Sequence, residues 1–267
     1  MQPSDLRIAL LSGNYNYVRD GANQALNRLV EYLLRVGANV RVYAPTVENP
    51  AFEATGDLVS VPSAAIPFRP EYRLPLCLPP SVRRDLAAFA PNVVHIASPD
   101  IVSHRAVSWA RQRKIPAVAS IHTRFETYLA YYHLQALEPA VRAIMRRLYS
   151  RCDAIVAPAE STAAVLHAQR MNKHISIWSR GIDREQFNPQ RRDLGWRRGL
   201  GIQDNEFTIA FLGRIVMEKG LDVFSAAVKA LEDRKVAHRV VVIGEGPARA
   251  WLEQQLPTAI FVGEQTG

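Results

Sequence analysis

Two cations in a short loop are the first residues whose types and spacing point to chemistry. Arg214 and Lys219 lie within residues 211–220, between an apolar strand-like segment at 208–212 and an apolar helical segment that opens at Gly220. A helix N-terminus carries partial positive charge, and its free backbone N–H groups bind anions. Together with an Arg and a Lys, this loop suits a phosphate group. A surface loop with two solvated cations is the alternative.

The segments around this loop predict the elements that position it. Short apolar strands are expected at residues 207–212, 239–243 and 259–262, with helices at residues 221–234 and 248–256. Strands that alternate with helices predict a parallel sheet covered by those helices. The second half of the chain has room for about three such strands.

The first half of the sequence shows the same alternation. Strands are expected at residues 6–11, 40–44, 93–96, 117–121, 152–158 and 175–178. A helix is expected between Asp20 and Gly37, and Ser161 is expected to cap another helix. Residues 45–80 are rich in proline and are expected to be extended chain with one strand. The Gly-x-Gly-x-x-Gly fingerprint is absent, which argues against a dinucleotide-dependent oxidoreductase.

Two histidines stand at or near the ends of expected strands. His95 lies within the strand at 93–96, and His122 directly follows the strand at 117–121. In open α/β sheets, ligands bind beyond the carboxyl ends of the strands. Both histidines are therefore candidate ligand contacts. A structural hydrogen-bonding role is the alternative for each.

The composition limits the classes of protein to consider. The chain has 267 residues, 48% of them hydrophobic, and a net charge of +8, which favours anionic partners such as nucleotides or anionic lipid surfaces. No zinc-finger spacing or aromatic RNA-binding pattern supports a nucleic-acid partner. Two distant cysteines fit a reducing compartment. No apolar run is long enough to span a bilayer, so a cytoplasmic location is expected.

A basic helix is expected at residues 138–151. Its arginines share one broad face: Arg142, Arg146, Arg147 and Arg151. The apolar side is expected to contain Ala143, Ile144 and Leu148, with Met145 beside them. Such a helix predicts peripheral contact with an anionic membrane, on the inner face of the plasma membrane. The solvated face of an ordinary surface helix is the alternative.

The loop that follows the strand at 208–212 resembles a known motif. Gly213-Arg214 and Lys219-Gly220, with four residues between the two pairs, resemble the donor-phosphate loop of the GT-B retaining glycosyltransferases of family 4. The resemblance implies that Arg214 and Lys219 bind the diphosphate of a nucleotide sugar. It also implies an α/β fold of the GT-B class, with two Rossmann-like βα domains facing a cleft. The domains are then residues 1–178, on the acceptor side, and residues 179–267, an incomplete donor domain.

The resemblance extends to the segment around His122. Residues 120–125 are similar to the strand-end histidine motif of the family, whose histidine hydrogen-bonds the transferred sugar. His122, Arg214 and Lys219 are therefore the candidate catalytic residues. The resemblance also implies an acceptor-binding group: Arg124, Phe125, Tyr128 and Tyr131. Core aromatics on a helix are the alternative for these rings.

Three glycines are candidate donor-binding residues by the same resemblance. Gly13 and Gly21 occupy the places of the family's glycine loop after the first strand, although the usual Gly-Gly pair reads Asp20-Gly21 here. Gly246 lies in a segment that resembles the Gly-x-Gly-Pro turn below the nucleotide. A role restricted to tight turns is the alternative for these glycines.

The implied activity is retaining transfer of a hexose to a lipid or glycan acceptor. Residues 177–183 and 211–224 look most like bacterial GDP-mannose-dependent α-mannosyltransferases, and UDP-glucose remains an open alternative donor. No Asp-x-Asp motif is present, so neither a metal nor another cofactor is expected. The family's Glu-x-x-x-x-x-x-x-Glu motif is also missing, so we expect a fragment with apolar surface exposed. The alternatives are a sugar-nucleotide epimerase and a non-catalytic module that binds nucleotide sugars or membrane surfaces.

Overall fold

The computed structural model describes residues 2–66, 69–124, 127, 129, 134–182, 184–185 and 187–265, without the side chains of residues 69–71. The chain forms two compact units, the first extending to Gly181 and the second beginning at Ile182. The sequence places this boundary at residue 178. Each unit is described by itself below.

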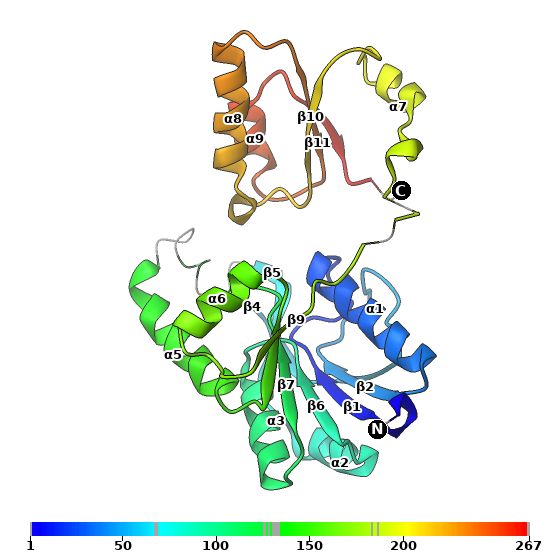
Figure 1. The fold of residues 1–267 in the computed structure, drawn as a ribbon, viewed down its shortest axis with the longest axis vertical. Coiled ribbons are helices and arrows are strands. Elements are labelled where there is room, and N and C mark those ends of the chain that lie inside the picture. Colours follow the sequence, from blue (N-terminus) through cyan, green and yellow to red (C-terminus); the bar gives the residue numbers. More distant parts are fainter. Residues whose placement is uncertain are drawn as a thin grey trace. The chain divides into compact units, whose positions relative to one another are not determined.

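Unit 1 contains a parallel sheet of seven strands in the order β3-β2-β1-β6-β7-β8-β9 (Figure 1). The strands are β1 (Arg7–Leu11), β2 (Asn39–Ala44), β3 (Asp57–Ser60), β6 (Val93–Ile96), β7 (Ala117–Ser120), β8 (Ala154–Ala157) and β9 (Ile175–Ile177). The main helices are α1 (Gly21–Arg35), α2 (Pro80–Phe89), α3 (Ile101–Gln112), α5 (Glu138–Tyr149) and α6 (Glu160–Ala168). The strand order reverses between β1 and β6, which makes this a doubly wound sheet with a switch point there.

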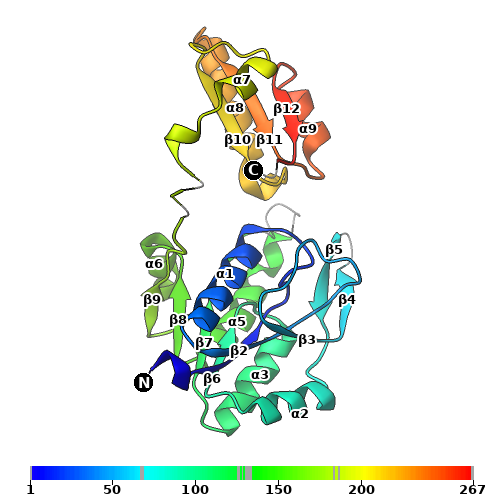
Figure 2. The ribbon, with the colours of Figure 1, turned by 90° about the vertical axis from the view of Figure 1, so that its right-hand side faces the viewer.

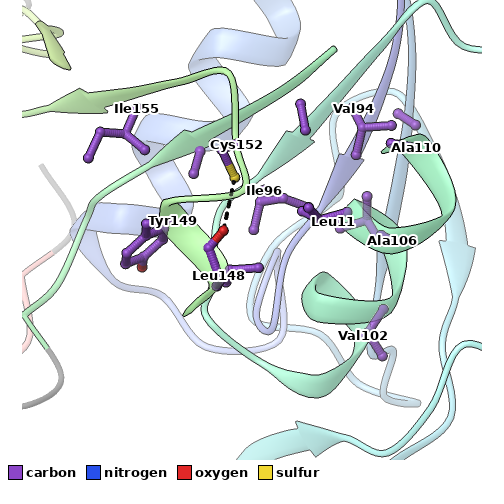
Figure 3. Close-up of a cluster of buried hydrophobic side chains, with 14 of the residues drawn as sticks. Leu11, Val94, Ile96, Val102, Ala106, Ala110, Leu148, Tyr149, Cys152 and Ile155 are labelled. Carbon is purple, nitrogen blue, oxygen red and sulfur yellow. Dashed lines mark hydrogen bonds between the residues drawn. The ribbon is translucent and has the colours of Figure 1, made fainter. Parts of the chain in front are cut away.

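Alternating side chains of the strands build a core on each face of this sheet. Ala9 and Leu11 of β1 contribute to the core under α2, α3, α5 and α6, whereas Ile8 and Leu10 contribute to the core under α1. Figure 3 shows part of the first core, in which strand residues meet side chains of α3 and α5. Buried Cys152 belongs to it, with Sγ 3.7 Å from the carbonyl oxygen of Leu148. Both faces of the sheet are thus used for packing.

Side-chain caps fix two of the helix starts, and a third expected cap is wrong. The Asp20 carboxylate accepts a hydrogen bond from the Asn23 N–H at 2.9 Å and so caps α1. Asp100 caps α3 in the same way. The sequence predicts Ser161 as the cap of α6, but the helix already begins at Glu160, and its N-cap residue Ala159 makes no side-chain cap. The local sequence favoured the serine because its hydroxyl is a common cap.

A β-hairpin in the proline-rich segment was missed by the sequence analysis. The expected single strand is β3, but β4 (Ser63–Ile66) and β5 (Arg69–Pro75) also form a two-stranded antiparallel sheet beside unit 1's main sheet (Figure 2). Proline lowers the strand signal because it lacks an N–H donor. A two-stranded ribbon tolerates proline because each strand has an edge that needs no hydrogen bonds.

Helix α5 buries only part of the expected apolar side. Met145, Leu148 and Tyr149 are buried, whereas Ala143 is exposed and the Ile144 side chain is 55% exposed. Apolar residues cover a wide arc of this helix, so the sequence leaves the choice of buried side open. Contact with α3 and the sheet decides it. Among the described residues, no helix is long and apolar enough to cross a bilayer.

Unit 2 contains a parallel sheet of three strands, as the sequence predicts. Its elements are η4 (Pro189–Arg191), α7 (Leu194–Gly199), β10 (Thr208–Leu212), η5 (Met217–Lys219), α8 (Leu221–Asp233), β11 (Arg239–Ile243), α9 (Arg249–Gln255) and β12 (Ile260–Gly263). Helices α8 and α9 lie on one side of the sheet and α7 on the other (Figure 1). Several apolar side chains of unit 2 face solvent, including Phe207 at 62% and Leu212 at 72% exposure.

Candidate functional site

The loop after β10 in unit 2 carries the two cations Arg214 and Lys219. Gly213 leaves the strand with φ of 148°, and its N–H donates to the carbonyl oxygen of Ile243 at 3.0 Å. The short helix η5 follows, and Gly220 then adopts a left-handed φ of 73° at the start of α8. Glycine suits both positions because a side chain rarely tolerates these φ values. The loop therefore makes the strand–turn–helix arrangement that the sequence predicts.

The loop contains two cations beside the start of a helix. Arg214 is half-buried directly after the turn, and Lys219 is exposed at the end of η5. The N-cap residue of α8, Gly220, has no side chain that could cap the helix. The first N–H groups of a helix lack partners within the helix and can bind an anion, and the helix dipole favours negative charge there. This part of unit 2 can therefore bind a phosphate group.

Gly246 is held against the same loop. A β-carbon on Gly246 would lie 2.2 Å from the Ile215 carbonyl oxygen, and one on Gly244 would lie 2.0 Å from the Gly213 carbonyl oxygen. Real β-carbons do not approach backbone atoms this closely. The Ile215 N–H also donates to the Glu245 carbonyl oxygen at 2.9 Å. The two glycines thus let the β10 and β11 loops pack backbone to backbone, and a donor contact at Gly246 stays a prediction.

Gly13 lies at the switch point of the sheet in unit 1. It follows β1, and its N–H donates to Ser98 Oγ, beyond the end of β6, at 2.7 Å. The Tyr17 hydroxyl donates to the Gly13 carbonyl oxygen at 2.7 Å. Gly21 is the first residue of α1 and has open space where a β-carbon would stand. Both candidate glycines thus lie on the segment between β1 and α1, where open sheets bind ligands.

His122 lies beyond the end of β7 in a mostly buried setting. Its Nε2 is 2.8 Å from Ser120 Oγ, and its ring meets the Trp178 ring edge to face at 5.6 Å between centroids. The Arg180 guanidinium donates to the His122 carbonyl oxygen at 3.3 Å. Arg180 has a left-handed φ of 67°, which is uncommon outside glycine. Four side chains from β7 and from the segment after β9 therefore meet at this strand end.

Both strand-end histidines are neutral at ordinary pH. Burial lowers the pKa of His95 to about 4. Burial also lowers the pKa of His122 to about 3, with further lowering by the positive charge of Arg180 and by His95. An imidazole with such a low pKa carries no charge, and it donates a hydrogen bond from one nitrogen and accepts one at the other. His122 is thus suited to hydrogen-bonding a neutral hydroxyl group.

The predicted acceptor group falls mainly on residues that the structure does not describe. Phe125, Tyr128 and Tyr131 lie outside the described residues. Arg124 is described and half-buried, and its carbonyl oxygen accepts hydrogen bonds from the N–H and the hydroxyl of Thr127. The acceptor-binding role of all four stays a prediction.

The structure adds partners that the sequence analysis did not single out. Ser98 contacts Gly13, and Ser120 lies between His95 and His122. Ser120 could have been found from its position two residues before His122, because alternate residues of a strand share a face. Trp178 carries no such local signal, since it follows a different strand. In the described part of the chain, no three His, Cys, Asp or Glu side chains are grouped to hold a metal ion.

Comparison with known proteins supplies the family. A family model described as Glycosyltransferase Family 4 matches residues 19–186, more than half of the chain. The chain belongs to glycosyltransferase family 4. A second model, Glycosyl transferases group 1, matches residues 194–259. The first match covers most of unit 1 of the family 4 chain and continues past Gly181 into unit 2, and the second lies within unit 2.

Curated relatives match nearly the whole family 4 chain. A GDP-mannose-dependent alpha-mannosyltransferase from Corynebacterium glutamicum is 28% identical over 98% of the chain, and one from Mycolicibacterium smegmatis is 31% identical over 98%. An alpha-monoglucosyldiacylglycerol synthase from Acholeplasma laidlawii is 23% identical over 93%. The chain spans only 63%, 69% and 66% of the lengths of these three proteins.

Solved structures place the family 4 chain in the GT-B fold class. Sucrose-phosphate synthase from Thermosynechococcus elongatus matches with a TM-score of 0.71 over 97% of this chain and 70% of its own, at 16% identity. WaaG, a glycosyltransferase of lipopolysaccharide biosynthesis, matches with a TM-score of 0.59 over the same shares. At these identities the likeness shows the fold alone.

Proposed function

We propose that the protein is a retaining glycosyltransferase that moves mannose from GDP-mannose to a lipid or glycan acceptor. The cationic loop of unit 2 carries this proposal, because it brings Arg214 and Lys219 together with the start of α8, whose N-cap residue is Gly220. The names of the Corynebacterium and Mycolicibacterium relatives support mannose and GDP. The name of the Acholeplasma relative supports a lipid acceptor.

In this proposal the cations of unit 2 act on the leaving group. As the bond from sugar to phosphate breaks, negative charge grows on the diphosphate. Arg214 and Lys219 stabilise that charge, and the N–H groups at the start of α8 add to the effect. The removal of one such group from an active site costs about 2–4 kcal/mol of transition-state stabilisation. The reaction then needs no metal ion or other cofactor to neutralise the diphosphate.

His122 of unit 1 hydrogen-bonds a hydroxyl group of the transferred sugar. The low pKa of His122 supports this role, because a neutral ring orients a hydroxyl without forming an ion pair with the diphosphate. Gly13 and Gly21 contact the donor phosphates or the acceptor, which is supported at Gly21 by the open space where a β-carbon would stand. Arg124, Phe125, Tyr128 and Tyr131 contact the acceptor.

The acceptor side works at an anionic membrane surface on the cytoplasmic side of the cell. Exposed Ile144 and Arg147 of α5 support this part of the proposal. The other three arginines of the expected basic face have partners within unit 1: Arg142 pairs with Glu138, Arg146 donates to the Gln169 carbonyl oxygen, and Arg151, just beyond the end of α5, donates to Ser108 Oγ. The proposed membrane contact therefore involves fewer positive charges than the four arginines of the expected basic face.

The donor is tested by isothermal calorimetry with GDP-mannose and UDP-glucose. The titrations use this chain and a version lengthened with the C-terminal third of the Mycolicibacterium relative. Selective binding of GDP-mannose by the lengthened protein, followed by transfer of radiolabelled mannose to a lipid extract, is the expected result. Binding of UDP-glucose and not of GDP-mannose would identify UDP-glucose as the donor.

Two other outcomes would replace the proposal with its alternatives. Release of an altered free sugar or nucleotide without any acceptor would identify a sugar-nucleotide epimerase. Binding without turnover, in the lengthened protein and with a range of lipid extracts, would identify a non-catalytic module. Because both readouts come from one preparation, a failure to bind is separated from a failure to react.

A further inference from the structure

Three polar side chains form a continuous hydrogen-bonded line on one face of the unit 1 sheet. His95 Nε2 lies 2.9 Å from Ser120 Oγ, and Ser120 Oγ lies 2.8 Å from His122 Nε2. His95 alternates with Val94 and Ile96, whose side chains belong to the core on the opposite face, so its ring points toward the α1 side. His95 and Ser120 are 9% and 2% exposed, so water does not readily replace these contacts.

The hydroxyl of Ser120 has a single proton to give. A neutral imidazole carries its proton on one of its two nitrogens, and the other nitrogen accepts. If Ser120 donates to one Nε2, it accepts from the other. The histidine that receives the proton then has a bare Nε2, and the histidine that donates carries Nε2–H. The line therefore requires the two rings to be opposite tautomers.

The surroundings of His122 decide the direction of the line. His122 Nδ1 is buried and has no hydrogen-bond partner among the described residues. An N–H group buried without an acceptor is rarer in proteins than an acceptor without a donor. The positive charge of Arg180 disfavours a second proton on this ring, so the ring stays neutral. The missing acceptor at Nδ1 therefore favours a bare Nδ1 on His122 and a proton on its Nε2.

We propose that Ser120 and His95 are positioning residues that hold the ring of His122, the proposed sugar contact, in the Nε2–H tautomer with a bare Nδ1. The proton order is then His122 Nε2–H to Ser120 Oγ, and Ser120 Oγ–H to His95 Nε2. His95 carries its own proton on Nδ1. The part that concerns the sugar rests on the proposed function, whereas the tautomers are a property of this chain alone.

The tautomers are tested by nitrogen NMR on the chain labelled with ¹⁵N-histidine. Long-range proton–nitrogen spectra separate protonated from bare ring nitrogens, and the His95→Gln and His122→Gln variants assign the signals. The expected result at pH 7 is Nε2–H with bare Nδ1 for His122, and the reverse for His95. A protonated Nδ1 on His122, or an imidazolium at this pH, would overturn the proposal.

Variants at position 120 test the coupling. Ser120→Ala removes the link, and we expect the ratio of His122 tautomers to change at least about fivefold, the effect of losing one ordinary hydrogen bond. Ser120→Thr keeps a hydroxyl and should keep the wild-type signals. Ser108→Ala, in α3, removes a serine hydroxyl that contacts a different part of unit 1, and serves as the matched control. Identical His122 signals in Ser120→Ala and wild type would disprove the coupling.

The role toward the sugar is tested by kinetics of the lengthened protein. Ser120→Ala should lower kcat by about fivefold or more with little change in KM for the donor, and Ser120→Thr should restore most of it. Unchanged kcat would contradict a positioning role. If the spectra show the expected tautomers but the lengthened protein binds no sugar nucleotide, the proposed function and the sugar contact fail while the tautomer assignment stands.

Discussion

Gly246 and Ile215 are so close that the Ile215 carbonyl oxygen lies 2.2 Å from the place of a β-carbon on Gly246. This oxygen also accepts a hydrogen bond from the Ala248 N–H at 3.1 Å. The β11 loop is thereby fixed against the segment that leads from Arg214 to Lys219. The geometry of the candidate phosphate loop therefore depends on a glycine, Gly246, in the neighbouring loop.

Gly246→Ala should destabilise unit 2. The added methyl group meets backbone rather than a flexible side chain, so one loop must shift, at a cost of about 1–3 kcal/mol. Urea unfolding followed by tryptophan fluorescence measures the change. Gly199→Ala, at the end of α7, is the matched control because nothing lies within 4 Å of its would-be β-carbon. Equal stability of the two variants would show that the loops move apart freely.

Arg214→Ala and Lys219→Ala should each reduce sugar transfer by about a hundredfold or more in the lengthened protein. The expected loss lies mainly in kcat, because charge on the diphosphate grows in the transition state. Arg234→Ala, an exposed cation at the opposite end of α8, is the control for general loss of positive charge. Near-normal turnover in either loop variant would remove the phosphate assignment.

Stability should fall in mild acid because His95 is buried in its neutral form. Its pKa is lowered to about 4, whereas the unfolded chain binds the proton near pH 6.5. The free energy of unfolding therefore decreases as the pH drops below about 6.5, by roughly 2 kcal/mol at pH 5 for this histidine. Urea unfolding at pH 7, 6 and 5 measures the slope.

The histidine variants separate this effect from other acid-sensitive groups. His95→Gln should reduce the slope by about half, because His122 is also buried in its neutral form and keeps its own contribution, even if the variant lowers stability at pH 7. His174→Gln, an exposed histidine beside β9, should keep the wild-type slope. A wild-type slope in His95→Gln would mean that other groups cause the acid sensitivity.

The exposed part of α5 should contribute to membrane binding. Each cation near an anionic surface adds roughly 1 kcal/mol, and Ile144 adds apolar contact. The double variant Ile144→Ser/Arg147→Ser should bind phosphatidylglycerol vesicles at least about fivefold more weakly in sedimentation assays. Arg105→Ser, an exposed cation on α3, is the control. If the wild-type protein bound phosphatidylglycerol vesicles no more tightly than neutral vesicles, the membrane contact would be contradicted.

The sequence by itself determined the alternation of strands and helices and the loop that carries Arg214 and Lys219. Both are local: apolar runs of strand length are bounded by turn residues, and glycine provides the unusual φ values that the turn needs. The three-stranded sheet of unit 2 follows from the same alternation. Because β7 is paired in parallel with β6, His122, which follows β7, lies at the edge of the sheet where the carboxyl ends of the strands meet. The position of His122 directly after an apolar segment is enough to predict this.

Only the tertiary structure decided which of these residues touch. The link from His95 through Ser120 to His122 joins two strands, and the contact of Gly246 with Ile215 joins two loops. On α5, the wide apolar arc let the sequence favour Ile144 for burial, while packing selected Met145. Such outcomes depend on contacts between segments far apart in the chain, and local periodicity carries no information about them.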